Sequence, residues 1–129
     1  MGCFDSFKVG ENNKLNLPVP KDEYQTKDLG KNLILYQIGD DGVIKPTECN
    51  AWQGEFYLDE DEALEFKSGH YNGIIVLYGD LADGTWKEYM LVIENSKIVY
   101  IWDHGETLYT DSPDSEQRYR DLVNAHLGL

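Results

Sequence analysis

The chain has 129 residues, of which 41% are hydrophobic and 12% aromatic, a composition that predicts one globular domain. Its 24 acidic and 11 basic residues give a formal net charge of −13, which disfavours direct contact with nucleic acid or with anionic membranes. No apolar run approaches the ~20 residues of a membrane helix, and the first residues lack the apolar core of a secretory signal. With only Cys3 and Cys49 there is no disulfide framework, so we expect a cytoplasmic protein.

Residues 1–30 predict an extended or loop-like segment that wraps around the edge of a sheet. They contain Asn12-Asn13, Pro18 and Pro20, with only scattered apolar side chains. Proline and asparagine at this density do not support a helix.

An N-terminal hairpin is predicted next. The apolar run at residues 33–38 is typical of a strand, the Gly-Asp-Asp-Gly at residues 39–42 of a turn, and residues 43–45 of a returning strand that Pro46 ends. Residues 55–58 predict a further short strand.

Residues 59–69 change in character and predict a short acidic helix. Asp59 is placed as its N-cap, Glu62 stands three residues further on as in a capping box, and Gly69 supplies the C-terminal stop. The acids lie at the positive end of the helix dipole, where they stabilise it.

The most strongly patterned stretch is residues 72–102, which predicts a three-stranded antiparallel meander. Its strands span residues 73–78, 85–94 and 97–102, separated by a break at residues 79–84 and a hairpin loop at Asn95-Ser96. Glu94 opposite Lys97 sets the register. This register pairs Ile93 with Ile98, Leu91 with Tyr100 and Tyr89 with Trp102 on one face, and Val92 with Val99 and Met90 with Ile101 on the other.

A C-terminal helix follows, with Ser112 as the predicted N-cap, Pro113 as its first residue and Gly128 as its end. One apolar stripe should face the sheet, formed by Tyr119, Leu122, Val123 and Leu127. The predicted fold class is therefore α+β: a twisted antiparallel sheet, built from the meander and the N-terminal hairpin, with a C-terminal helix and one short acidic helix. The predicted core is Ile75, Leu77, Tyr89, Leu91, Ile93, Ile98, Tyr100, Trp102, Leu122 and Val123.

Three segments resemble a group of small uncharacterised phage and prophage proteins: Met1-Gly2-Cys3-Phe4-Asp5, Tyr24-Gln25-Thr26-Lys27-Asp28-Leu29 and Tyr36-Gln37-Ile38-Gly39-Asp40-Asp41-Gly42. Those proteins open with Met-Gly-Met-Phe-Asp, so Cys3 replaces a methionine here, and Tyr24 replaces the phenylalanine of their Phe-Gln-Thr-Lys-Asp-Leu segment. The group has no established activity. The resemblance implies an accessory protein of a mobile element that works inside a bacterium.

Patterns that would indicate chemistry are incomplete. His104-Gly105-Glu106 reproduces half of the zinc-deaminase pattern, which makes Asp103, His104 and Glu106 weak metal candidates, but the Pro-Cys-x-x-Cys half is absent. Cys49 with His104 and Asp103 would supply a nucleophile, a base and an orienting group, yet no feature beside Cys49 stabilises a thiolate. Gly2 and Ser6 match a myristoylation pattern that a bacterial host would not use. We therefore expect no cofactor and no membrane partner.

The acidic cluster carries the functional hypothesis. Asp59, Glu60, Asp61, Glu62 and Glu65 lie in a stretch with no base, which predicts contact with a cytoplasmic host protein whose surface is basic. Trp52, Phe56 and Trp86 form a secondary candidate surface. We expect a non-catalytic binding module, as a monomer or small homo-oligomer. The alternatives are a small enzyme with scattered acid/base or metal site residues, an immunity protein or a virion accessory; an acidic surface that only confers solubility is a further possibility.

Overall fold

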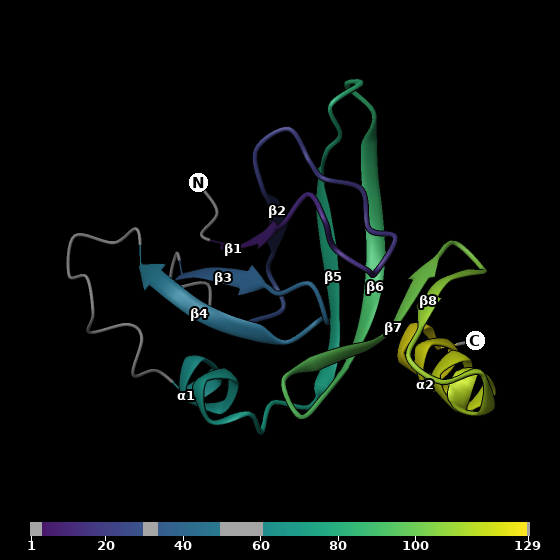
Figure 1. The fold of residues 1–129 in the computed structure, drawn as a ribbon. Helices are drawn as coiled ribbons and strands as arrows, with labels where there is room; N and C mark the ends of the chain where they lie inside the picture. The colour runs from purple at the N-terminus through teal and green to yellow at the C-terminus, as the bar shows by residue number, and fades with distance from the viewer. Residues whose placement is uncertain (1–3, 30–33, 50–60, 129) are drawn as a thin grey trace.

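The computed structural model describes residues 4–29, 34–49 and 61–128, and these form one curled, eight-stranded sheet with two α-helices (Figure 1). The elements are β1 (Asp5–Val9), β2 (Tyr24–Thr26), β3 (Ile34–Ile38), β4 (Ile44–Cys49), α1 (Asp61–Ser68), β5 (Gly73–Asp80), β6 (Trp86–Glu94), β7 (Lys97–Asp103), β8 (Glu106–Thr110), the 3₁₀ turn η2 (Pro113–Ser115) and α2 (Glu116–Leu127). The strand order is β4-β3-β1-β2-β5-β6-β7-β8. The predicted α+β class is confirmed, although β1 and β3 run parallel and make the sheet mixed.

The sheet curls until its β4 edge reaches the start of β7, one strand in from the opposite β8 edge. The turn between β3 and β4 reaches the start of β7, where the Ile98 N–H donates to the Gly42 carbonyl at 2.9 Å and the Ile44 N–H to the Ser96 carbonyl at 2.8 Å. Val43 and Lys97 form an isolated bridge between them. Strand pairing thus extends from the hairpin at one end of the sheet to the meander at the other, and an enclosed inner face results.

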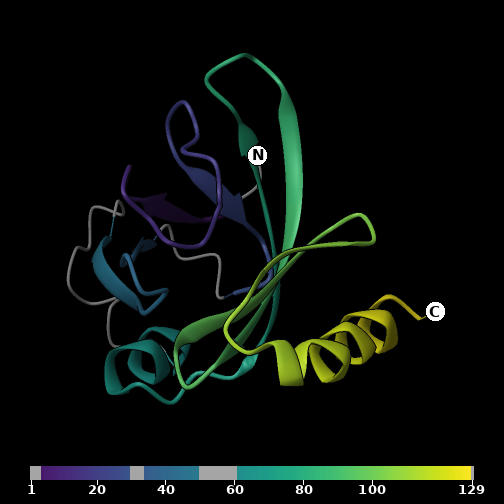
Figure 2. The same ribbon diagram turned by 45° about the vertical axis from the view of Figure 1, so that its right-hand side comes forward.

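Two apolar cores lie on opposite faces of this sheet. The inner core holds the larger set, including Phe7, Tyr36, Ile75 and Leu91, and α1 closes it with Ala63 and Phe66. The outer core lies on β6 and β7, where Tyr119 and Val123 of α2 cover Met90, Val92, Val99 and Tyr100. Figure 2 shows α1 at one end of the curled sheet and α2 outside it.

Residues 4–29 do not wrap an edge but supply two internal strands. β1 lies between β3 and β2, and β2 joins this half of the sheet to β5. The apolar sequence pattern of β1 is short, because two of its buried residues, Asp5 and Ser6, are polar and lie beside the buried Phe7. The Asp5 carboxylate accepts the Ile34 N–H at 3.0 Å, so a polar residue occupies a place that the pattern reserved for an apolar one.

The predicted hairpin at residues 33–45 forms, but Pro46 does not end its second strand. β4 continues to Cys49, with Pro46 opposite Tyr36 and a register shift between Leu35 and Tyr36. β4 is an edge strand, so the missing N–H of Pro46 breaks no ladder on its outer side.

The meander register is correct at its hairpin and wrong beyond it. Glu94 pairs with Lys97 and Ile93 with Ile98 as predicted, but the register then shifts, and Val92 pairs with Tyr100, Leu91 with Ile101 and Met90 with Trp102. Val99 is the extra residue of a β-bulge. As a result Val99 and Tyr100 both face the outer core, whereas the prediction placed Tyr100 beside Leu91 on the other face.

Both predicted helices are present. Gly69 ends α1 at φ +77°, with its N–H on the Phe66 carbonyl and the His70 N–H on the Glu65 carbonyl. Gly128 ends α2, also at φ +77°, but Ser112 makes no side-chain cap and Pro113 begins a 3₁₀ turn rather than the helix itself. Leu122 is 40% exposed and leaves the predicted core, and Trp102 is only partly buried. Asp59 and the strand predicted at residues 55–58 lie outside the described residues.

Candidate functional site

Three carboxylates from two distant segments lie near enough to Tyr71 for their charges to act on its phenol. Burial first, and then the charges of Glu62, Glu65 and Asp28 in that order, raise the pKa of Tyr71 to about 12. Glu65 and Asp28 are exposed and Glu62 is half-buried, and Asp61 is exposed one residue before Glu62. We call Asp28, Asp61, Glu62, Glu65 and Tyr71 the acidic surface. None of its four carboxylates forms an ion pair with a residue in the described parts of the chain.

A row of four packed rings holds Tyr71 and α1 on the inner core. Phe7 stacks on Tyr36 with ring centroids 5.0 Å apart, Tyr36 meets Phe66 at 4.8 Å, and Phe66 stacks on Tyr71 at 4.1 Å. Phe66 is itself 1% exposed, so α1 cannot shift without opening the core. The carboxylates on α1 are therefore presented from a fixed helix.

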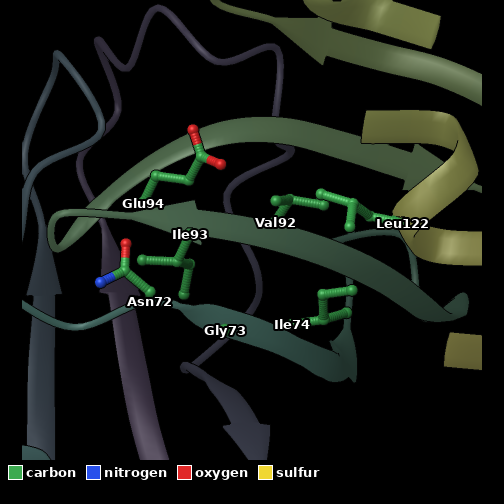
Figure 3. Close-up of a pocket in the computed structure, with 7 residues that line it drawn as sticks. All are labelled: Asn72, Gly73, Ile74, Val92, Ile93, Glu94 and Leu122. Atoms are coloured by element: carbon green, nitrogen blue, oxygen red, sulfur yellow. The ribbon is translucent and has the colours of Figure 1, made fainter. Parts of the chain in front are cut away.

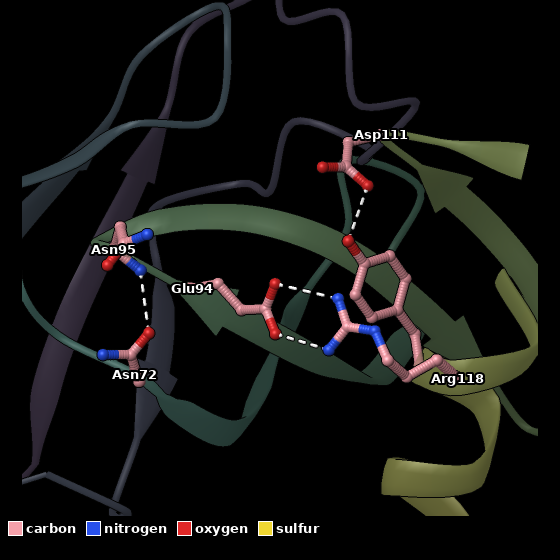
Figure 4. Close-up of polar contacts among 6 residues, drawn as sticks. Asn72, Glu94, Asn95, Asp111 and Arg118 are labelled. Carbon is pink, nitrogen blue, oxygen red and sulfur yellow. Dashed lines mark hydrogen bonds and ion pairs between the residues drawn. The ribbon is translucent and has the colours of Figure 1, made fainter. Parts of the chain in front are cut away.

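The end of α1 is also tied to the turn between β6 and β7. The Ser96 hydroxyl donates to the Glu65 carbonyl at 3.2 Å and accepts the Tyr71 N–H at 3.1 Å. The Ser96 N–H donates to the Tyr71 carbonyl at 2.8 Å. Next to it, the Asn95 N–H donates to Asn72 Oδ1 at 3.0 Å (Figure 4).

Asp28 is the carboxylate of the acidic surface that sequence reasoning missed. Its Oδ2 accepts the Val76 N–H at 2.7 Å, on the side of β5 that β2 pairs only at Tyr78. Burial raises the pKa of Tyr78, and the charges of Asp28 and Glu88 raise it further. A lone Asp in a bend, far from α1 in the chain, carries no sequence signal for this role.

Some predicted site residues are outside the described residues: Asp59, Glu60, Trp52 and Phe56. Trp86 is described and 55% exposed at the start of β6, with its ring 5.9 Å from that of Tyr78. It therefore remains an exposed aromatic residue, paired with Asp80 at the end of β5.

The weak metal candidates do not assemble. His104 Nδ1 lies 2.9 Å from Asp103 Oδ1, and Lys87 Nζ lies 3.9 Å from the other oxygen of the same carboxylate. Glu106 pairs with Asp103 across the β7–β8 turn without completing a ligand set. Within the described ranges, no three His, Cys, Asp or Glu side chains form a group that could hold a metal ion.

Two apolar pockets flank α2 on the outer face of the sheet. The Leu122 pocket, of about 300 Å³, is lined by Asn72, Gly73, Ile74, Val92, Ile93, Glu94 and Leu122 (Figure 3). The Leu127 pocket, of about 240 Å³, is lined by Val76, Glu88, Met90, Trp102, His104 and Leu127. Leu122 and Leu127 point to different flanks because five residues turn a helix by about 140° beyond a full turn. Val123 lies between them and is fully buried.

A polar frame fixes α2 between these pockets. Arg118 donates to both oxygens of Glu94 at 2.8 and 3.2 Å, and its guanidinium lies 4.6 Å from the centre of the Tyr119 ring. The Tyr119 hydroxyl donates to Asp111 at 2.9 Å. Arg120 donates to the Gly105 carbonyl and to the Thr107 hydroxyl at 2.9 and 2.8 Å.

Comparisons with protein-family models, with curated proteins and with solved structures returned no match. Among the described residues, neither helix has the length and apolar character needed to cross a bilayer.

Proposed function

We propose that this protein is a non-catalytic binding module that uses its acidic surface to engage a cytoplasmic protein with a basic face. The observation that supports it is the convergence of Glu62, Glu65 and Asp28 around Tyr71. The charges of Glu62 and Glu65 on α1 and of Asp28 in the bend after β2 all act on Tyr71, and Phe66 anchors α1 in the core. Carboxylates that form no ion pair within the described residues, presented from a fixed helix, attract a basic surface.

The sequence adds two arguments. Asp59 and Glu60 precede α1 and extend the run of acids, and the formal charge of −13 would steer a basic partner toward the molecule. The phage-like opening points to a host factor as the partner, and a nucleic-acid-binding protein is the class whose groove carboxylates can fill.

Immobilised protein exposed to a bacterial lysate tests the proposal. The variant Asp61→Lys/Glu65→Lys should lose the captured partner, and wild-type capture should fall as salt rises to ~0.5 M, because screening weakens exposed charges. The control Glu106→Lys/Asp114→Lys changes the net charge equally at exposed acids elsewhere and should retain the partner. Capture that survives charge reversal on α1 would refute the acidic surface and favour the exposed ring of Trp86.

A further inference from the structure

We infer that the Leu127 pocket binds a small organic ammonium ion, an amine that carries one aromatic or alkyl group. The inference goes beyond the proposed function, because this pocket lies on the outer face of the sheet and shares no residue with the acidic surface. Three observations carry it. The floor of the pocket is apolar and partly aromatic, one carboxylate in its lining has no cationic partner among the described residues, and its volume suits a small molecule.

The register of three strands forms the apolar floor of the pocket. Met90 of β6 pairs with Val76 of β5 on one side and with Trp102 of β7 on the other. All three pack in the outer core, and Leu127 of α2 lines the pocket beside them. A ligand in the pocket would cover the 42% exposed side chain of Leu127 and the exposed part of Trp102. Burial of this apolar surface would hold the apolar group of the ligand.

Glu88 supplies the charge at this pocket. It stands two residues before Met90, so both side chains lie on the same face of β6, and it is exposed. Glu88 forms no ion pair within the parts of the chain that the structure describes. Burial raises the pKa of Tyr78, its neighbour across β5 and β6, and the charges of Asp28 and Glu88 raise it further. Both charges that act on this phenol are negative, so the carboxylate of Glu88 is available to a cation.

The other ionisable groups near the pocket are already engaged. His104 Nδ1 lies 2.9 Å from Asp103 Oδ1, and Lys87 Nζ lies 3.9 Å from the other oxygen of that carboxylate. An anionic ligand would compete with Asp103 for these side chains and would be repelled by Glu88. A cationic ligand would meet Glu88 and the indole of Trp102, whose ring face attracts positive charge. The charges therefore select a cation.

The volume of the pocket limits the size of the ligand. At about 240 Å³ it lies just below the ~300–1,000 Å³ of pockets that hold drug-sized ligands. With ~30 Å³ for each water molecule, it holds the equivalent of about eight waters. One ring with a short charged chain fits this space. A lysine side chain of a partner protein has related chemistry, so the test must distinguish a free amine from such a side chain.

Four probes each change one feature of the expected ligand. Phenylethylammonium carries the ring and the positive charge, phenylethanol carries the ring without a charge, and phenylpropanoate carries the ring with a negative charge. N-acetyl-lysinamide carries the positive charge on an alkyl chain, as a lysine of a partner protein would. Binding is followed by the backbone amide chemical shifts of isotope-labelled protein. These shifts also show whether Val76, Met90 and Trp102 lie at the binding site.

Two pairs of variants test the lining of the pocket. Glu88→Gln removes the charge and keeps the shape of the side chain, and Glu11→Gln does the same at an exposed glutamate in the loop after β1 that does not line the pocket. Leu127→Gln makes the wall polar, and Leu122→Gln is its control on the other flank of α2, where the leucine is 40% exposed. All four positions are exposed, and an unchanged circular dichroism spectrum confirms that each variant folds.

Phenylethylammonium should bind wild-type protein about fivefold or more tightly than phenylethanol, because contact with Glu88 and attraction to Trp102 add to the burial of the ring. In Glu88→Gln this ratio should fall below about twofold, because the contact between charges is lost. Leu127→Gln should weaken the binding of both compounds. Glu11→Gln and Leu122→Gln should bind both compounds as wild type does.

Each other outcome would overturn the inference. Equal binding of phenylethylammonium and phenylethanol, tighter binding of phenylpropanoate, or an equal loss in Glu11→Gln would show that Glu88 does not select a cation. Tighter binding of N-acetyl-lysinamide than of phenylethylammonium would assign the pocket to a lysine of a partner protein. Resonances of the pocket that shift with protein concentration alone would assign it to a second copy of the chain. If no probe shifts these resonances, the pocket binds no small amine.

Discussion

Glu94 on β6 accepts two hydrogen bonds from Arg118 on α2, and this pair holds the helix against the sheet beside the Leu122 pocket (Figure 4). The hydrogen bonds from Arg118 lower the pKa of Glu94 below its usual 4.5. Because the pKa is lower in the folded state, the pair stabilises the fold above pH 4.5, and the stabilisation is lost as pH falls through the folded pKa. The effect is modest, since both side chains are partly exposed.

Arg118→Met should therefore lower the thermal midpoint near pH 7, and the difference from wild type should shrink as the pH falls below 4.5. Arg120→Met is the control, because Arg120 on the same helix bonds only neutral acceptors, a carbonyl and a hydroxyl. Its difference from wild type should stay constant over the same range. Parallel pH curves for the two variants would contradict the assignment to Glu94.

The closure of the curled sheet depends on Gly42. Its φ is +90°, and a Cβ there would lie 3.2 Å from the Ile98 carbonyl oxygen and 3.3 Å from a methyl group of Leu15. Gly42→Ala should lower the free energy of unfolding by about 2–3 kcal/mol, from backbone strain plus crowding. Gly84 has φ +87° with no atom within 4 Å of the added Cβ, so Gly84→Ala should cost only about 1 kcal/mol. If urea unfolding gives the same loss of free energy for Gly42→Ala and Gly84→Ala, the contact of Gly42 with β7 is not important for stability.

The sequence indicates those elements whose pattern is local. Runs of β-branched and aromatic residues on either side of Asn95-Ser96 predict β6, β7 and their hairpin correctly, and Gly69 and Gly128 mark the ends of both helices. The bulge at Val99 is not predictable in this way, because every residue from Ile98 to Trp102 is apolar and either face suits it. β1 is not predicted for the opposite reason, since the buried Asp5 interrupts its apolar pattern.

The candidate site also contains residues that the sequence pattern identifies and residues that only the fold brings to it. The acids of α1 are evident from a contiguous run, but Asp28 joins them only through the pairing of β2 with β5. The α2 pockets arise because Leu122 and Leu127 flank the stripe that Tyr119 and Val123 form. A helical wheel places all four on one broad face, and only the packing of α2 shows which two reach the sheet.

The anchoring of α1 can be tested at Phe66. Phe66→Ala removes the ring between Tyr36 and Tyr71 at a 1% exposed position and should lower the free energy of unfolding by about 3–5 kcal/mol. Leu64→Ala on the exposed face of the same helix should cost less than about 0.5 kcal/mol. Both are measured by urea denaturation. A small effect for Phe66→Ala would mean that α1 does not close the inner core.

Tyr71 reports on the acidic surface through alkaline stability. Its pKa is raised to about 12 in the folded protein, chiefly by burial and then by Glu62, Glu65 and Asp28, against 10.0 when unfolded. A raised pKa means that stability is fully present below pH 10 and is lost as pH rises toward 12, because the unfolded chain then releases a proton that the folded protein keeps. Tyr71→Phe should remove this part of the alkaline loss.

Glu62→Gln/Glu65→Gln should reduce the same loss without abolishing it, since burial remains the larger cause. The measurement is the thermal midpoint from pH 9 to pH 12, compared with Glu106→Gln/Asp114→Asn, which removes two exposed acids elsewhere. Other buried tyrosines, including Tyr24 and Tyr36, also have raised pKa values, so only the difference between the variants is informative. In a Tyr71→Phe background the two double variants should behave alike. If they already behave alike with Tyr71 present, the carboxylates of α1 do not act on Tyr71 and the acidic surface is not assembled in solution.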